Sequence, residues 1–177
     1  MQFKACLRAI TPHRMLVVLA GASAAILGMA LVSQYGFNLQ PCTMCMWQRY
    51  PYMLVIALAG GVALFTRASQ PVWLSHVIKA CIAILLVGSA IAFYHVGVEL
   101  DLVPGPTACS GAGIGTAKTL EELRAQIFST PLISCSRPAF VFLGISMAGW
   151  NGIMSTLLAL IVMLHCKLRK EQNVSNR

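Results

Sequence analysis

Four long stretches without any formal charge dominate the sequence. They lie between the following pairs of charged residues: Arg14 and Arg49 (34 residues), Arg49 and Arg67 (17), Lys79 and Glu99 (19), and Arg137 and Lys167 (29). A membrane-spanning helix needs about 17–25 predominantly apolar residues. The four stretches therefore predict an all-α polytopic membrane protein, built as a bundle of four transmembrane helices with two loops on the outer side.

The charge-free stretches also predict where the spans lie. We expect them near Met15–Val32, Met46–Phe65, Lys79–Phe93 and Phe142–Leu164, in a single membrane domain that covers the whole chain. The second span is short, so Arg49 and Arg67 are expected to extend their charged groups outward from its two ends. Basic residues precede the first span, as in a signal peptide, but no small-residue cleavage site follows it. A retained signal anchor is the better interpretation.

Composition excludes several other classes of protein. Hydrophobic residues make up 58% of the chain and charged residues 10%, whereas a typical globular chain has about 25% charged residues. A soluble domain of this size cannot bury that much apolar surface. The net charge of +8 is not gathered in one basic stripe, so nucleic acid is not an expected partner. A soluble enzyme and a disordered chain are equally disfavoured. We expect the protein to be embedded in the lipid bilayer.

The positive charges predict the orientation. Nine of the 13 Lys and Arg residues fall on one side of a four-span arrangement: Lys4, Arg8, Arg14, Arg67, Lys79, Lys167, Arg169, Lys170 and Arg177. The positive-inside rule places this side, with both termini, in the cytoplasm. In a bacterium the expected location is the inner membrane, with the two remaining loops in the periplasm.

The two periplasmic loops are expected to differ in size. The first is short, near Ser33–Pro41, and the second runs from about residue 96 to residue 140. Within the second, Gly111–Gly115 indicates irregular, flexible backbone. Thr119–Ser129 combines a capping-box pattern with an apolar face, which predicts a short helix. This helix is either a spacer or an amphipathic helix lying on the membrane surface.

The four-span arrangement sorts the seven cysteines. Four fall on the periplasmic side, where disulfides form and persist: Cys42, Cys45, Cys109 and Cys135. The other three fall at the cytoplasmic ends or inside a span: Cys6, Cys81 and Cys166. These three are most simply explained as buried small hydrophobic residues or idle thiols.

Cys42 and Cys45 form a C-x-x-C pair at the mouth of the second span, directly after Pro41, a residue typical of helix starts. A disulfide between them closes a very small ring and stabilises the fold little. A redox role is therefore favoured, because a thiolate near a helix N-terminus has a lowered pKa. Zinc binding usually requires a second close pair, but Cys109 and Cys135 are 26 positions apart. No metal site is expected.

Two further residues fall near this pair in the predicted topology. Arg49 follows Cys45 by four positions, so on a helix the two share a face, and the arginine would stabilise a Cys45 thiolate. The alternative is that Arg49 anchors the end of the span at the membrane interface. His95 ends the third span on the same side, where a lone histidine is more often an interfacial residue than a catalytic one.

Taken together, the motifs carry a resemblance to a known family. The segment Gln40–Arg49 contains the C-x-x-C pair and the arginine four residues later. It is accompanied by further segments: Phe93–His95, Pro104–Cys109, Cys135, Phe142–Gly144 and Trp150. This set resembles the DsbB family of quinone-coupled, disulfide-generating membrane proteins, and the likeness extends over nearly the whole chain. Gln48 stands where some members of the family have an acid.

The resemblance implies a role for each cysteine. Cys42 and Cys45 match the membrane-proximal redox pair of the family, with Cys45 facing the quinone. Cys109 and Cys135 match the loop pair that exchanges with a periplasmic thiol oxidase of the DsbA type, with Cys109 forming the mixed disulfide. These four are the expected catalytic residues.

The resemblance also implies a quinone site and an electron path. Arg49 and His95, together with Cys45, match residues at the site of the quinone, which is ubiquinone or menaquinone. DsbA-type proteins are strong oxidants, near −120 mV, so another dithiol–disulfide pair alone hardly reoxidises them. The membrane quinone pool is a stronger acceptor. Electrons are expected to pass from the partner to Cys109–Cys135, then to Cys42–Cys45, and then to the quinone.

Three alternatives remain open at this point. The chain can be a paralogue that serves a dedicated thiol oxidase with a narrow set of substrates. It can be a non-redox scaffold whose periplasmic cysteines form static disulfides. It can be a b-haem anchor, because His13, His76 and His165 fall near the cytoplasmic end of the predicted bundle. Haem ligation, however, needs histidines inside the bundle at matching depth.

Overall fold

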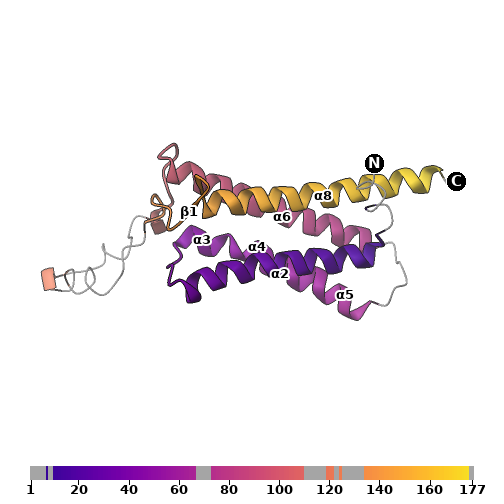
Figure 1. Cartoon of the computed structure of the whole chain (residues 1–177), viewed down its shortest axis with the longest axis horizontal. Helices are drawn as coiled ribbons and strands as arrows, with labels where there is room; N and C mark the ends of the chain where they lie inside the picture. The colour runs from indigo at the N-terminus through magenta and orange to yellow at the C-terminus, as the bar shows by residue number, and fades with distance from the viewer. Residues whose placement is uncertain are drawn as a thin grey trace.

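The protein is a bundle of long helices with a small two-stranded sheet at one end (Figure 1). The computed structural model describes residues 7, 10–66, 73–109, 119–121, 124 and 134–175. Within these residues, three helices are long and apolar enough to cross a membrane: α2 (Pro12–Gly36), α6 (Leu74–Glu99) and α8 (Met147–Ser175). The prediction of a mainly helical membrane protein is thereby confirmed. The ranges of α2 and α6 enclose the expected spans Met15–Val32 and Lys79–Phe93.

A fourth helical rod, Thr43–Phe65, is interrupted. It consists of α3 (Thr43–Trp47), α4 (Arg49–Val55), the π-helical segment η1 (Ile56–Gly60) and α5 (Gly61–Phe65). Pro51 has no N–H group and cannot bond back to the carbonyl of Trp47, and it lies in the first turn of α4, where proline is tolerated. The expected span Met46–Phe65 is therefore helical but built from short pieces.

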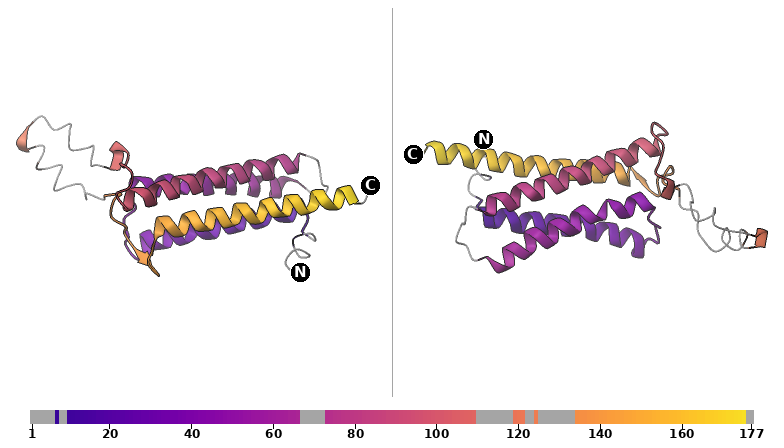
Figure 2. Two further views of the ribbon diagram at one scale, coloured as in Figure 1. Left: turned by 90° about the horizontal axis from the view of Figure 1, so that it is seen from above. Right: turned by 180° about the vertical axis from the view of Figure 1, so that it is seen from behind.

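The four rods pack in two layers, with α6 beside α8 and α2 beside the fourth rod (Figure 2). Buried apolar side chains from all four rods form one core, including Leu19, Val55, Leu85 and Val162. The layers approach closely at Gly88 of α6, where an added Cβ would lie 2.9 Å from the Cβ of Pro51. Glycine permits this approach because it has no side chain.

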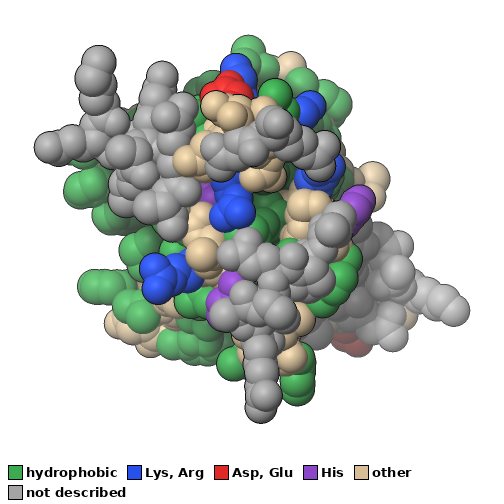
Figure 3. Space-filling model, turned by 90° about the vertical axis from the view of Figure 1, so that its right-hand side faces the viewer, with side chains coloured by type: hydrophobic (Ala, Val, Ile, Leu, Met, Phe, Trp, Pro, Cys, Tyr) green, Lys and Arg blue, Asp and Glu red, His purple; other side chains and the backbone are tan. Residues whose placement is uncertain are grey.

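The start of α2 and the end of α8 lie at the same end of the bundle (Figure 1). Two contacts hold α8 against residues that precede α2: His165 Nδ1 donates to the carbonyl of Leu7 at 2.9 Å, and Arg169 Nη1 donates to the carbonyl of Ile10 at 3.3 Å. Figure 3 views this end directly, and several Lys and Arg side chains come to its surface. The sheet and the C-x-x-C pair lie at the opposite end.

A tight hairpin precedes α8. Strands β1 (Val141–Phe142) and β2 (Ile145–Ser146) pair antiparallel. The turn between them places Leu143 at φ 52° and Gly144 at φ 79°, and two consecutive left-handed residues are typical of hairpin turns that match the twist of the strands. The fourth span was expected to begin at Phe142, but the helix begins at Met147, because the left-handed turn cannot continue into a helix. Among the described residues, this short sheet is the one departure from the predicted all-α fold class.

Of the remaining predicted boundaries, one differs from the structure and the others fall outside the residues that the structure describes. Helix α6 continues through Glu99, so the large loop starts later than the expected residue 96. The predicted helix Thr119–Ser129 lies mostly outside the described residues. Gly111–Gly115, Arg67 and Cys6, for which the sequence also made predictions, lie wholly outside the described residues.

Candidate functional site

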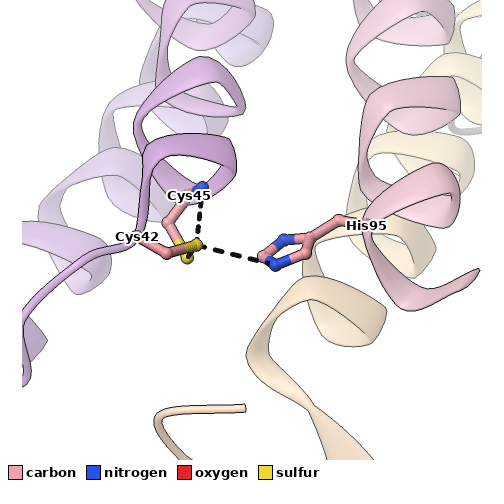
Figure 4. Close-up of side chains that lie close together, drawn as sticks. All are labelled: Cys42, Cys45 and His95. Atoms are coloured by element: carbon pink, nitrogen blue, oxygen red, sulfur yellow. Dashed lines mark hydrogen bonds between the residues drawn. The ribbon is translucent and has the colours of Figure 1, made fainter. Parts of the chain in front are cut away.

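The C-x-x-C pair lies at the start of the fourth rod, where Cys42 is the N-cap of α3. Its Sγ accepts a hydrogen bond from the backbone N–H of Cys45 at 3.2 Å. The two sulfur atoms lie 2.8 Å apart as free thiols (Figure 4). A disulfide bond is about 2.03–2.05 Å long, so oxidation of this pair requires a movement of less than about 1 Å.

The two thiols differ in their tendency to ionise. The hydrogen bond shared with Cys45, together with a contact from His95, lowers the pKa of Cys42 to about 4, against the opposing effect of burial. The same shared hydrogen bond and burial raise the pKa of Cys45. The backbone N–H of Cys45 and the imidazole of His95 both favour negative charge on Cys42, whereas the sequence led us to expect a thiolate on Cys45 beside Arg49.

His95 is part of the site rather than an interfacial residue. It projects from α6 and is 2% exposed, and its Nε2 lies 3.6 Å from the Sγ of Cys42 (Figure 4). The same nitrogen lies 3.9 Å from Oε1 of Glu99, one turn further along α6. The imidazole also hydrogen-bonds the backbone of Cys135. A single ring thus contacts a thiol of one cysteine pair and the backbone of the other.

Behind His95 lies a chain of polar side chains that sequence reasoning did not identify as part of the site. Gln48 Nε2 lies 2.7 Å from His95 Nδ1, and Asn151 Nδ2 donates to Gln48 Oε1 at 2.6 Å. The hydroxyl of Tyr52 donates to Oδ1 of Asn151 and lies 2.6 Å from Oγ of Ser155. Asn151 and Ser155 are polar residues within an apolar span, where such side chains hydrogen-bond across neighbouring helices.

Arg49 is turned inward. It is 8% exposed, and its Nη1 donates a hydrogen bond of 2.6 Å to Oε1 of Gln34 on α2. The expectation that its charged group extends outward from the end of the span is therefore wrong, because the guanidinium has a partner inside the bundle. Arg49 and Cys45 line the same cavity. The role of Gln34 could not be read from the sequence, since the partner of Arg49 depends on how α2 is rotated.

The second cysteine pair is oxidised. Cys109 and Cys135 form a disulfide with their Cα atoms 5.4 Å apart. Cys135 is buried in a small cluster with Cys42, Met44 and Val98, and Cys45 and Cys109 pack against this cluster. All the predicted catalytic cysteines are thereby brought to one place, a disulfide and a dithiol in direct proximity.

A cavity of about 490 Å³ opens beside the dithiol. Its walls come from α2, the fourth rod, α6, the segment around the hairpin and the start of α8, and their surface is largely apolar. Polar side chains also line it, including those of Cys42, Cys45, Gln48, Arg49, His95, Glu99, Arg137 and Asn151. A cavity that is mainly apolar, with a few convergent polar groups, is typical of a site for an organic molecule.

The same residues do not complete a structural metal site. The ligand atoms of Cys42, Cys45 and His95 lie within 4.8 Å of one another. Among the described residues this group has three members, and a closed structural zinc site requires four ligands. The donors are engaged with one another instead.

Two further cysteines and two further histidines among the described residues have structural surroundings. Cys81 is buried in the helical core as a free thiol, and Cys166 packs against it. His13 Nε2 lies 3.0 Å from the carbonyl oxygen of Ala63, and His165 donates to the carbonyl of Leu7. Both histidines are thus engaged by the backbone, which does not favour the haem alternative.

Comparison with known proteins identifies the family. The model of the family described as disulfide bond formation protein DsbB matches residues 12–165. The disulfide bond formation protein B of Mannheimia succiniciproducens is 30% identical over 81% of this chain and 82% of its own length. The protein of that name from Cupriavidus metallidurans is 27% identical over 89% and 93%. The uncharacterized protein RP370 of Rickettsia prowazekii is 25% identical over 84% of both chains.

No solved structure matches the chain at a significant level. The family match nevertheless covers most of the chain, including both cysteine pairs and the residues that surround them. This chain therefore belongs to the DsbB family of disulfide bond formation proteins.

Proposed function

We propose that this protein is a membrane thiol oxidase that reoxidises a periplasmic dithiol oxidase of the DsbA type and passes the electrons to a membrane quinone. One observation carries the proposal: a disulfide, Cys109–Cys135, and a dithiol, Cys42 and Cys45, share one buried cluster beside an apolar cavity. A static scaffold has no need of a reduced pair in contact with an oxidised one.

The thiol chemistry proceeds by exchange, and each step conserves the electron pair. A thiolate of the partner attacks Cys109, which forms a mixed disulfide and releases Cys135 as a thiolate. The second partner thiol then attacks this mixed disulfide, so that the partner leaves oxidised and both loop cysteines are reduced. When Cys42 and Cys45 are joined by a disulfide, the loop pair reduces them in the same way. The arrangement described here, with the inner pair reduced, is the state that follows this transfer.

The cavity fits the head group of a quinone, a flat apolar ring with two carbonyl oxygens. When bound there, a quinone supplies an acceptor for two electrons and two protons. Arg49 offers guanidinium N–H groups that bind carbonyl oxygens, and its hydrogen bond to Gln34 keeps it facing the cavity. Cys45 lines the same space, and His95, with its Nε2 3.6 Å from the Sγ of Cys42, supports negative charge on that sulfur.

The proposal includes four membrane spans with both termini in the cytoplasm of a bacterium, and the redox cysteines in the periplasm. Among the described residues, three helices are long and apolar enough to span, and the fourth rod runs beside α2 through the same bundle. The start of α2 and the end of α8 lie together at the end that carries several Lys and Arg side chains (Figure 3), and the cysteine cluster lies at the other. The positive-inside rule supports this orientation.

The decisive experiment is turnover with purified components. Full-length protein in detergent, a reduced DsbA-type partner and either ubiquinone or menaquinone should give one quinone reduced for each partner disulfide formed. Cys45→Ser protein, which cannot re-form the inner disulfide, is the control and should show no turnover. Absence of quinone reduction by folded wild-type protein with both quinones would refute the proposal. Comparison of several partners would separate a general oxidase from one that serves a dedicated partner.

A further inference from the structure

We propose that the hairpin before α8 is an interfacial anchor, whose apolar tip at Leu143 inserts into the headgroup boundary of the bilayer beside the start of that helix. The inference goes beyond the redox function proposed above, and it rests only on the membrane-spanning helices. It concerns strands β1 and β2 and the turn between them.

The residues that lead into the turn are apolar and exposed. Phe140, Val141 and Phe142 are half-exposed, and Leu143 is 77% exposed. Successive residues of a strand point to opposite faces, and both residues of β1 are exposed, so both faces of this strand present apolar surface. An antiparallel hairpin with one face in water commonly alternates apolar and polar residues instead. The composition of this hairpin therefore favours apolar surroundings.

The residue at the tip is unusual for its conformation. Leu143 has φ 52° and Gly144 has φ 79°, and two-residue turns of this kind favour Asn or Asp before the glycine. A leucine at positive φ is uncommon, and the protein leaves most of this side chain uncovered. A polar residue would suit both the turn and water. Leucine is explained if the tip contacts lipid, because its apolar surface is then removed from water.

The charges that flank α6 and α8 place the hairpin at the boundary of the bilayer. A helix rises about 1.5 Å per residue, so about 20 residues cross the hydrocarbon core, which is about 30 Å thick. On α6, Glu99 follows Lys79 by 20 positions with no charge between them. On α8, the same length counted back from Lys167 ends at Met147, the first residue of the helix. Both helices therefore leave the hydrocarbon core where the hairpin begins.

A contact between the two helices shows that these two boundaries lie at one level. Gly149 of α8 faces α6, since an added Cβ would lie 3.8 Å from Cγ2 of Val96. The helices run in opposite directions (Figure 1), so Glu99, three residues after Val96, is about level with Ser146, three residues before Gly149. Ser146 is the last residue of β2. The hairpin therefore lies at the level of the headgroups.

The hairpin also projects to one side of the bundle at the start of α8, as the left view of Figure 2 shows. Trp150, in the first turn of α8, holds it there. Its Nε1 donates to the carbonyl of Phe142 at 3.0 Å, and the two rings lie 6.3 Å apart. Tryptophan is enriched at the boundary between membrane and water. A segment that projects sideways at this level meets lipid, whereas a soluble partner approaches from the water layer.

An anchor at this place bears on two other observations. Phe140 and Phe142 form part of the wall of the cavity beside the dithiol, so insertion of the tip holds this part of the wall at the level of the lipid. It also explains why hydropathy placed the start of the fourth span at Phe142. The apolar signal continues through a segment that contacts lipid without being helical.

The experiment locates the hairpin by fluorescence quenching in nanodiscs of phosphatidylcholine and phosphatidylglycerol. The full-length protein, with its three non-redox cysteines replaced by alanine and both redox pairs oxidised, carries one added cysteine labelled with the fluorophore NBD. Leu143→Cys is compared with two other exposed apolar positions: Val174→Cys in the last turn of α8 and Leu160→Cys in its middle. The quenchers are iodide in water and lipids that carry a spin label either near the headgroup or near the end of the chain.

Iodide should quench the label at Leu143→Cys at least about threefold less than the label at Val174→Cys, because an interfacial segment is shielded from water. The spin label near the headgroup should quench it more than the deeper one, and this order should reverse at Leu160→Cys. Equal quenching by iodide at the first two positions would overturn the proposal. Shielding that arises only when a reduced partner protein is added would also overturn it, and would make the hairpin a docking surface for that protein.

A second variant separates contact with lipid from the shape of the turn. Leu143→Asn suits the left-handed turn but places a polar side chain at the tip. A label at Val141→Cys should become about twofold or more accessible to iodide in this variant, whereas Leu143→Met, which keeps an apolar tip, should leave it unchanged. Unchanged accessibility in the asparagine variant would overturn the role of Leu143. These measurements require neither partner nor quinone, so their result is independent of the proposed redox function.

Discussion

Cys42 and Cys135 are far apart in the sequence but pack into the same buried cluster, 6% and 1% exposed. His95 contacts both, through the Sγ of Cys42 and the backbone of Cys135. The two cysteine pairs are therefore neighbours in the fold, as the proposed exchange between them requires.

The cysteines should divide into two functional classes. Simultaneous replacement of Cys6, Cys81 and Cys166 by alanine should leave disulfide formation nearly intact, because Cys81 and Cys166 lie in or against the helical core, away from the redox cluster. Replacement of any one of the four clustered cysteines by serine should stop turnover. The measurement is the redox state of the partner in cells, followed by thiol trapping. Substantial activity of Cys45→Ser protein would contradict the relay.

Cys135→Ser should trap the partner. Without Cys135, the thiol of Cys109 has no neighbour within its own loop pair, so oxidised partner should accumulate as a mixed disulfide with Cys109. Non-reducing gels should show a partner-sized adduct that disappears on reduction. A Cys109→Ser, Cys135→Ser double variant is the control, and it should show none. An adduct that persists in the double variant would assign the contact to another cysteine.

Arg49→Lys should impair the reaction with quinone. Lysine keeps the charge but cannot reproduce the fixed, multi-donor geometry that the hydrogen bond to Gln34 holds in place. A hydrogen bond to a charged group is worth about 1.5–3 kcal/mol, so kcat/KM for quinone should fall roughly tenfold to a hundredfold, and Arg49→Gln should be worse. Steady-state quinone reduction measures this. Wild-type kinetics in the lysine variant would return Arg49 to the role of an anchor.

The stability of the reduced protein should depend on pH through Cys42. Its pKa falls from 9.0 to about 4 on folding, so between these values the unfolded chain binds one more proton than the folded chain at this site. The free energy of unfolding should therefore rise with pH across this window and be insensitive to Cys42 below it. Thermal unfolding of reduced wild type and of Cys42→Ser should diverge as pH increases from 5 to about 8. A constant difference between them would show that Cys42 is a thiol when folded.

Reporter fusions should establish the topology. Fusions after Gln70 and at the C-terminus should be active only as cytoplasmic reporters, and a fusion near Gly113 only as a periplasmic one, because the positive residues concentrate on the side of the termini. Alkaline phosphatase and a fluorescent protein, placed in turn at each position, give complementary signals. A periplasmic C-terminus would rule out an even number of spans with a cytoplasmic N-terminus.

The sequence alone was sufficient to identify the family and to predict that the chain is helical and spans the membrane. A bilayer rejects charge, so long charge-free stretches are visible without any knowledge of packing. The C-x-x-C pair and its proximity to a helix start were equally visible, because residues three positions apart remain neighbours in almost any local structure. The start of α8 was misplaced, since Leu143 and Gly144 form a left-handed turn that hydropathy does not register.

The tertiary structure decided the partners of the side chains. The inward position of Arg49 against Gln34, the burial of His95 and the contact between Gln48 and Asn151 all depend on how each helix is rotated about its axis. Rotation is set by close packing, such as that of Gly88 against Pro51, and not by the pattern of any single helix. A hydropathy pattern with almost no polar face leaves that rotation undetermined, because lipid and protein interior are equally apolar surroundings.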